Sequence, residues 1–304
     1  MKKKILIIGG TGFLGSSLCK YSIIKRYKTI SVSSRKTKFK KINQVKYIFC
    51  DITKINEIKK KLNFNVDYVV NFSGYVDHSN KKKTYRSHYI GCKNLVQFFK
   101  KRNIKKFIQI GSSLEYGRTK SPHYEKFKKI DVSSLKSIYA KSKLLATNYC
   151  LEAFSRDFFP VSIVRPYLVY GPGQKNNRLI PFIISESLKN KKFPCSSGSQ
   201  IRNFLFIDDF IKGIFKILSS KNVNGEIINI GSNENLRIKK VILMITNYIK
   251  LGKPLFGKIK LRKDESLRYY PNIKKAEKLI NWKPKIKFEK GMIKTIKYYL
   301  KNND

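Results

Sequence analysis

The sequence predicts an α/β protein, a doubly wound parallel sheet with a smaller C-terminal α/β lobe. Three observations support this class. Short apolar runs alternate with helical patterns over the first half of the chain, a glycine-spaced turn follows the first run, and the pattern becomes less regular after about Arg165. Alternating strands and helices are typical of a parallel sheet with helices on its faces. With 304 residues, 41% of them hydrophobic, the chain is long enough to bury such a core.

Six runs in the first half are rich in Ile, Val, Tyr or Phe and lack polar alternation, which is typical of strands buried on both faces of a parallel sheet. The expected strands are Ile5–Ile8, Thr29–Ser33, Val45–Phe49, Tyr68–Asn71, Phe107–Ile110 and Val161–Val164. The helical patterns between them are Leu14–Lys25, Ile55–Leu62, Tyr89–Lys101 and Ser137–Phe154. Residues 1–165 are therefore expected to form one large domain.

The second half is less regular, and Gly171-Pro172-Gly173 interrupts it early. Two helical patterns follow, at Ile180–Lys189 and Asp208–Leu218, with short extended pieces and a basic C-terminal region. We expect residues 203–235 to pack back onto the large domain. The smaller substrate lobe would then consist of residues 166–202 and 236–304.

The chain is strongly basic, with 66 Lys and Arg against 19 Asp and Glu and a net charge of +47. Such a charge is a footprint of nucleic-acid binding. However, only 12 of the basic residues are arginine, and lysine is spread from Lys2 to Lys301 together with abundant Ile and Asn, which indicates a coding bias. We therefore interpret the charge as solvated surface and expect no nucleic-acid partner. One further interpretation of the charge stays open, namely that its positive field steers a small anionic substrate to the protein.

The spacing of the cysteines and histidines and the length of the apolar runs argue against several classes of protein. The five cysteines, Cys19, Cys50, Cys92, Cys150 and Cys195, form no C-x-x-C pair, so we expect buried free thiols in a reducing compartment. The three histidines have no metal-binding spacing, so no metal is expected. No apolar run approaches the roughly 18 residues of a membrane helix. We expect a cytoplasmic protein without membrane insertion.

The turn after the first strand is the strongest local signal. Ile5–Ile8 runs directly into Gly9-Gly10-Thr11-Gly12-Phe13-Leu14-Gly15, where a helix begins. In such a turn the glycines permit a tight bend, a close approach of the backbone to a pyrophosphate, and close packing of helix on strand. The helix N-terminus then presents free N–H groups to the anion. This context predicts a Rossmann-type domain that binds a dinucleotide.

The end of the second strand distinguishes between two nicotinamide cofactors. Ser34 and Arg35 follow it, with no Asp or Glu nearby. An acidic residue here binds the ribose hydroxyls of NAD, whereas an Arg accommodates the additional phosphate of NADP. We therefore expect NADP(H) in preference to NAD(H). Asp51, after the third strand, is placed to hold the adenine amino group.

Tyr139 and Lys143 lie four residues apart in a helical pattern, and therefore on one face of the helix. A lysine ammonium close to a phenol favours the phenolate and lowers the tyrosine pKa from its reference value near 10. That effect suits a tyrosine for proton transfer to or from a sugar oxygen near neutral pH. Such a pair alone is common, but here it accompanies the glycine turn.

Together these motifs resemble the extended short-chain dehydrogenases, also called the NAD-dependent epimerase/dehydratase family, over nearly the whole chain. The resemblance implies that Ser112, Tyr139 and Lys143 are catalytic, Ser112 lying four residues before Tyr116. Further segments similar to the family's are Arg165-Pro166-Tyr167-Leu168-Val169-Tyr170-Gly171-Pro172-Gly173, Arg202–Asp209, Asn229-Ile230-Gly231 and Asn281-Trp282-Lys283-Pro284. The implied cofactor contacts are Gly9, Gly12, Phe13, Leu14, Gly15, Ser34, Arg35, Asp51, Ile52, Phe72, Ser73, Gly74, Tyr139, Lys143 and Pro166. The implied substrate contacts are Ser113, Tyr167, Arg202 and Arg262, the two arginines on a nucleotide diphosphate.

Departures from the family pattern narrow the expected activity. In the family's 4,6-dehydratases an Asp and a Glu follow the catalytic Ser or Thr, but here Ser113 and Leu114 stand in those places. Neither can act as an acid or base, so we expect no dehydratase activity. His88 and Leu168 stand where the family commonly has Asn, and Asn203 where it has Asp.

The resemblance leaves three functions open. The basic end of the second strand and the Gly111–Gly117 turn favour an NADP-dependent reductase of a nucleotide-linked 4-keto-6-deoxyhexose in surface-polysaccharide biosynthesis. The first alternative is a 4-epimerase of nucleotide sugars with tightly bound NAD. The second is a non-catalytic scaffold that senses cofactor or binds RNA.

Other residues have simpler interpretations. We expect His123 in an exposed loop, Trp282 as a packing residue, and His88 in helix packing or contact with substrate. Helices at Tyr89–Lys101 and Ser137–Phe154 are expected, by resemblance, to pair with a second copy in a four-helix homodimer interface.

Overall fold

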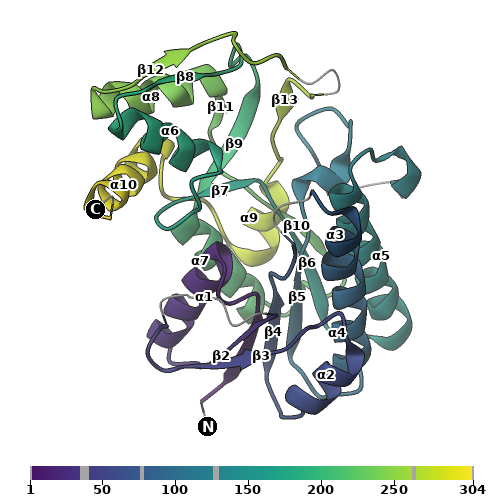
Figure 1. Ribbon diagram of the computed structural model, residues 1–304. Helices are drawn as coiled ribbons and strands as arrows, with labels where there is room; N and C mark the ends of the chain where they lie inside the picture. The colour runs from purple at the N-terminus through teal and green to yellow at the C-terminus, as the bar shows by residue number, and fades with distance from the viewer. Residues whose placement is uncertain (1, 35–40, 76–78, 126–129, 262–264, 303–304) are drawn as a thin grey trace.

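The computed structural model describes residues 2–34, 41–75, 79–125, 130–261 and 265–302 (Figure 1). Within these residues a seven-stranded sheet has the order β10-β6-β5-β4-β1-β2-β3, and every neighbouring pair is parallel. Its strands are β1 (Lys4–Ile8), β2 (Lys28–Ser33), β3 (Val45–Phe49), β4 (Tyr68–Asn71), β5 (Lys106–Ile110), β6 (Val161–Pro166) and β10 (Ile227–Ile230). The doubly wound α/β class and all six expected strands are confirmed.

Helices cover both faces of this sheet, as Figure 1 shows. On one face α1 packs against α7, and Tyr21 meets Phe215 edge to face at 4.8 Å between ring centroids. The helices of the other face are α2, α4 and α5. The bounds are α1 (Phe13–Ile24), α2 (Ile55–Lys61), α4 (Gly91–Phe99), α5 (Ile138–Asp157) and α7 (Ile207–Ser219).

The lack of polar alternation in the strands has a direct structural reason. Successive residues of a strand point to opposite faces of its sheet. In β1, Ile5 and Ile7 join the core beneath α1 and α7, whereas Leu6 and Ile8 join the core beneath α4 and α5. All four side chains are buried, so both faces of the strand must be apolar.

One helix differs from its expected form. The pattern at Tyr89–Lys101 predicted a helix from residue 89, but helical structure begins with α3 (Lys81–Tyr85) and continues through a π-helical turn (Arg86–Ile90) into α4. Asn80 caps α3 by accepting a hydrogen bond from the Lys83 N–H at 2.9 Å. The π-helical turn carries His88 into the interior.

The second half of the chain forms a smaller lobe above the carboxyl end of the large sheet (Figure 1). Its larger sheet has the order β11-β9-β13, with β7 also paired to β9, and β8 pairs with β12. The strands are β7 (Leu168–Tyr170), β8 (Lys192–Pro194), β9 (Ile201–Phe206), β11 (Asn235–Arg237), β12 (Lys253–Leu255) and β13 (Arg268–Tyr269). The helices are α6 (Leu179–Leu188), α8 (Ile238–Ile249), α9 (Lys274–Ile280) and α10 (Phe288–Lys301).

Along the sequence, the chain leaves the lobe after β9 and returns to the large domain before β11. After β9, α7 packs against α1, and β10 then pairs with β6 as the outermost strand of the large sheet. Residues 203–206 lie in β9, within the smaller lobe's sheet. The domain boundaries expected from the sequence, including the returning segment 203–235, stay a prediction. The helices expected at Ile180–Lys189 and Asp208–Leu218 are present within one residue at each end.

Several simpler expectations can be compared with the fold. All five cysteines are free and buried, as expected. Trp282 is 4% exposed and donates from Nε1 to the Asp209 carbonyl at 3.1 Å, which fits a packing role. Among the described residues, no helix has both the length and the apolar character that crossing a membrane requires.

Candidate active site

The glycine turn lies between β1 and α1. The backbone requires glycine at some of its positions but not at others. Gly9 has φ +79°, and a Cβ there would lie 3.1 Å from the Phe72 carbonyl carbon. A Cβ on Gly15 would lie 2.2 Å from the Gly9 oxygen, so these two glycines are required by the chain itself. Gly12 differs, because its φ is −82° and an added Cβ would meet only the Gly9 oxygen at 3.4 Å.

The exposed side of this turn fits a pyrophosphate. Gly12 is the N-cap of α1 without a side-chain cap, and the first turn of α1 carries no acidic side chain. The N–H groups of Phe13 and Leu14 therefore lack intrahelical acceptors at the positive end of the helix dipole. The protein itself leaves room for a Cβ at Gly12, and the glycine leaves the backbone open to a close approach from this side.

The other expected cofactor residues follow the carboxyl ends of the parallel strands, which meet at one edge of the sheet. Ser34 follows β2 and is exposed, while Arg35 lies outside the described residues. Asp51 follows β3, and its Oδ1 accepts hydrogen bonds from the Thr53 N–H at 2.9 Å and the Thr53 hydroxyl at 2.8 Å. Of the remaining expected contacts, Ile52, Phe72, Ser73 and Gly74 follow strands β3 and β4, and Pro166 is the last residue of β6.

Ser112, Tyr139 and Lys143 come together at the carboxyl end of β5. Ser112 follows β5, and α5 contributes the other two residues from successive turns. The Tyr139 phenol faces the Ser112 hydroxyl closely enough for hydrogen bonding between them to affect its pKa. Lys143 is 4% exposed; its Nζ donates to the Ile110 carbonyl at 2.7 Å and lies 6.0 Å from the centroid of the Tyr139 ring.

The electrostatics of this pair differ from the sequence-based expectation. We expected Lys143 to lower the Tyr139 pKa, but burial raises it, and the main opposing effect is the hydrogen bond with Ser112. The reason is geometric, because the Lys143 ammonium is directed to the Ile110 carbonyl rather than to the phenol oxygen. Burial also lowers the pKa of Lys143 to about 8.

His88 packs directly against Tyr139. Their ring centroids lie 5.0 Å apart in an edge-to-face arrangement, and His88 Nε2 lies 3.3 Å from the Tyr75 carbonyl. A Cβ on Gly74 would lie 1.8 Å from His88 Cε1, so the imidazole occupies the space beside that glycine. The π-helical turn at Arg86–Ile90 makes this contact, which the sequence pattern of an ordinary helix does not show.

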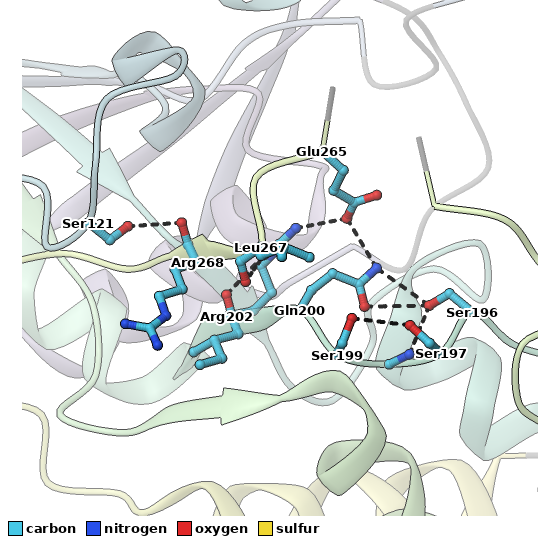
Figure 2. A network of polar contacts seen from close by, with 11 residues as sticks. Ser121, Ser196, Ser197, Ser199, Gln200, Arg202, Glu265, Leu267 and Arg268 are labelled. Carbon is cyan, nitrogen blue, oxygen red and sulfur yellow. Dashed lines mark hydrogen bonds and ion pairs between the residues drawn. The ribbon is translucent and has the colours of Figure 1, made fainter. Parts of the chain in front are cut away.

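Two of the expected substrate residues have protein partners. Tyr167 is 6% exposed, and its hydroxyl lies 2.7 Å from His123 Nδ1, an interior position that does not favour contact with substrate. Arg202 Nη2 lies 2.7 Å from Glu265 Oε1, and Figure 2 shows this carboxylate between Arg202 and Gln200. Arg262 lies outside the described residues.

The segment after Ser112 is tied to the smaller lobe. Ser113, another expected substrate residue, accepts a hydrogen bond at its carbonyl from the Tyr269 hydroxyl at 2.6 Å. The expectation that His123 lies in an exposed loop is wrong, since it is 1% exposed and its backbone pairs with Pro271. Burial lowers the pKa of His123 to about 4, so the ring is neutral near neutral pH.

Comparison with known proteins identifies the family. The model of the NAD dependent epimerase/dehydratase family matches residues 5–231. The chain belongs to this family. A dTDP-glucose 4,6-dehydratase of Haemophilus influenzae is 28% identical, with 98% of each chain covered, and the mouse dTDP-D-glucose 4,6-dehydratase is 30% identical over 99% of this chain and 89% of its own. The resemblance inferred from the motifs is therefore confirmed.

Solved structures agree with the fold. A UDP-glucuronic acid 4-epimerase from Bacillus cereus, in complex with UDP-glucuronic acid and NAD, has a TM-score of 0.86 at 24% identity, with 98% of this chain and 99% of that chain covered. A dTDP-glucose 4,6-dehydratase from Bacillus anthracis, in complex with NAD, has a TM-score of 0.82 at 25% identity, with 99% and 97% covered.

Membership of the family modifies two expectations. Because curated relatives are 4,6-dehydratases, the comparisons do not support our exclusion of dehydratase activity. These solved relatives contain NAD, so the preference for NADP(H) stays a prediction. The homodimer interface also stays a prediction.

The site contains a residue that motif matching missed. Glu115 is fully buried and forms a capping box with Ser112, each side chain accepting a hydrogen bond from backbone of the same turn. The sequence signal was available, since Ser-x-x-Glu is the pattern of a capping box. The family resemblance identifies Ser112 by its spacing from Tyr116, and this spacing gives Glu115 no role.

Proposed function

We propose that this protein is an NAD(P)-dependent oxidoreductase of nucleotide-diphosphate sugars that reduces the C4 keto group of a 4-keto-6-deoxyhexose. The observation that supports it most is the convergence of Ser112, Tyr139 and Lys143 at the sheet edge where the glycine turn lies. The resemblance to enzymes that act on nucleotide sugars suggests the substrate class.

The cofactor would lie along the carboxyl edge of the large sheet. Backbone N–H groups of Phe13 and Leu14 would hold its pyrophosphate, and Gly12 would allow the close approach. Ser34 and Arg35 follow β2 in the sequence, and their side chains would favour the additional phosphate of NADP(H). When bound, the nicotinamide supplies the hydride.

Tyr139 and Ser112 would act on the sugar oxygen at C4. Because burial raises the Tyr139 pKa, the phenol keeps its proton near neutral pH and can donate it to the oxygen of the reduced carbonyl. Ser112 would donate a second hydrogen bond to the same oxygen and so stabilise the charge that develops there. Lys143 would hold the nicotinamide ribose and stabilise the tyrosinate that remains.

Two positions next to Ser112 favour reduction over elimination of water. Elimination needs an acid and a base beside the sugar. Ser113 and Leu114 offer neither, and the Leu114 side chain is 45% exposed. Dehydration nevertheless remains an outcome that the assay below would detect.

A 4-epimerase is the second candidate, and solved neighbours named as epimerases favour it. The same Tyr139 and Ser112 would then serve oxidation and re-reduction at C4, with NAD kept bound throughout. In both reactions Arg202 would bind the substrate diphosphate after leaving Glu265, because an arginine fork pairs well with phosphate oxygens.

The test is a spectrophotometric assay, with analysis of the products, of purified protein with NADPH or NADH and a panel of nucleotide-linked 4-keto-6-deoxy sugars and 4-hydroxy sugars. We expect loss of reduced nicotinamide in equal amount to one of the sugars. Interconversion of 4-hydroxy sugar nucleotides without net loss would establish the epimerase, and release of water from a 4-hydroxy sugar would establish a dehydratase; either would overturn the reductase proposal.

Matched tyrosine variants keep the assay specific. Tyr139→Phe should abolish turnover and spare cofactor binding, whereas Tyr149→Phe, the same change farther along α5, should leave both intact. Near-normal turnover in Tyr139→Phe would contradict the proposed role of Tyr139.

A further inference from the structure

Glu115 is a buried carboxylate that binds three separate elements. Its Oε1 accepts the Ser112 N–H at 2.6 Å, and its Oε2 accepts the Thr147 hydroxyl of α5 at 2.8 Å. The same Oε2 accepts Arg165 of β6 through Nε at 2.9 Å and Nη2 at 2.8 Å. Both members of this ion pair are almost inaccessible to water, at 0% and 2% exposure of the side chain.

Such a pair needs an explanation other than stability. Removing two charges from water is costly, and a buried ion pair is often no more stabilising than apolar residues of equal volume. The Arg165 guanidinium also stacks 4.5 Å from the centroid of the Tyr116 ring, and its Nη1 has no hydrogen-bond partner among the described residues. The carboxylate, not the arginine, is therefore the fully coordinated member of the pair.

Glu115 and Lys143 bind neighbouring backbone groups at the end of β5. Lys143 Nζ donates to the Ile110 carbonyl, and Glu115 accepts the Ser112 N–H, so only Gly111 separates the two contacts. A Cβ on Gly111 would lie 2.4 Å from Glu115 Oε1, so the carboxylate occupies the space beside this glycine.

The Glu115 contacts also follow one face of α5. Thr147, which donates to Glu115, lies one turn after Lys143, and Lys143 lies one turn after Tyr139. The carboxylate thus joins the loop that carries Ser112 to the helical face that carries the other two residues.

We propose that Glu115 is a positioning residue, which fixes Ser112 against the Tyr139–Lys143 face of α5 and supplies the counter-charge of Lys143. This inference rests on the proposed function for its catalytic meaning, but its electrostatic part can be measured without any substrate. The carboxylate acts through Ser112 and Lys143 and takes no part in the chemical step.

The charges around Lys143 support this role. Burial lowers its pKa to about 8, and the largest opposing effect is the negative charge of Glu115; Cys92 on α4 has a smaller effect in the same direction. The other titratable group facing Lys143 is Tyr139 on its own helix. Without the carboxylate, we expect the Lys143 ammonium to lose its proton at lower pH, which would weaken its hold on a ribose and on a tyrosinate.

The experiment compares the single variant Glu115→Gln with the double variant Glu115→Gln/Arg165→Met. The single variant leaves Arg165 buried without its ion-pair partner and could fail to fold for that reason. The double variant removes both charges and so avoids this problem. Thr147→Val is the matched control, because it removes one hydrogen bond to Glu115 but no charge. The titration of Lys143 is followed by NMR of protein with ¹³C-labelled lysine, its signal being assigned by its loss in Lys143→Met.

We expect the Lys143 midpoint to fall by about one pH unit or more in Glu115→Gln, within the range for an opposite charge nearby. It should fall less in the double variant, because loss of the Arg165 positive charge acts in the opposite direction, and stay unchanged in Thr147→Val. The alkaline limit of turnover should move in the same direction. An unchanged Lys143 midpoint in the charge-removing variants would overturn the proposal. A shifted midpoint in a protein that reduces no sugar would leave the positioning role intact and reject the proposed reaction.

Discussion

Replacing Gly12 with Ala separates the binding of cofactor from the stability of the fold. At Gly12 the backbone has φ −82° and ψ 172°, which any residue adopts, and the added Cβ meets only the Gly9 oxygen at 3.4 Å. We expect the free energy of unfolding to change by less than about 1 kcal/mol, since a glycine-to-alanine change at a compatible position usually has small effects. At Gly15 the same methyl would lie 2.2 Å from a backbone oxygen, so Gly15→Ala should be strongly destabilising.

Although Gly12→Ala should hardly change stability, we expect it to weaken the binding of the cofactor. If a pyrophosphate packs against Gly12, the methyl group must displace it, and overpacking of this kind costs about 1–3 kcal/mol. That range corresponds to a loss of affinity of roughly 5- to 150-fold.

Both quantities can be measured on the same samples. Thermal unfolding reports stability, and quenching of Trp282 fluorescence or calorimetry reports the dissociation constants of NADPH and NADH. The reasoning is refuted if Gly12→Ala binds both cofactors with normal affinity, or if it unfolds as easily as Gly15→Ala.

Three further predictions follow from buried or paired charges. Burial lowers the pKa of His123 from 6.5 to about 4. Between these two pH values the unfolded chain binds a proton at His123 and the native protein does not. The free energy of unfolding should therefore fall by up to about 3 kcal/mol as the pH drops through this range. Urea unfolding across that range should show a smaller loss in His123→Gln. Arg165→Met alone should destabilise the protein by about 3–5 kcal/mol because it leaves Glu115 unpaired, and it should be less stable than the double variant with Glu115→Gln; equal denaturant midpoints would contradict this. Glu265→Gln should tighten the binding of UDP or dTDP by up to about fivefold, since the Arg202–Glu265 pair is partly exposed and worth about 1 kcal/mol or less; weaker binding in calorimetry would show that Glu265 helps to hold the nucleotide.

Local patterns predicted much of the large domain because their physical causes are local. A strand buried on both faces must be apolar along its length, and this requirement is visible in runs such as Ile5–Ile8 without knowledge of the partners. The glycine turn and the four-residue spacing of Tyr139 and Lys143 are likewise properties of short segments. The smaller lobe was harder to predict, because strands of two or three residues such as Arg268–Tyr269 carry little periodic signal.

The sequence by itself thus predicted the α/β class, six strands of the large sheet and the glycine turn between β1 and α1. With the family resemblance it also singled out Ser112, Tyr139 and Lys143, which the fold brings together. Only the tertiary structure decided how these groups interact. Glu115 meets Arg165 across 50 residues, and Arg202 meets Glu265 across 63. The physical reason is that burial and charge contacts depend on which segments the fold brings together. The direction of the Tyr139 pKa shift depends on those contacts, whereas the spacing of residues along one helix does not reveal it.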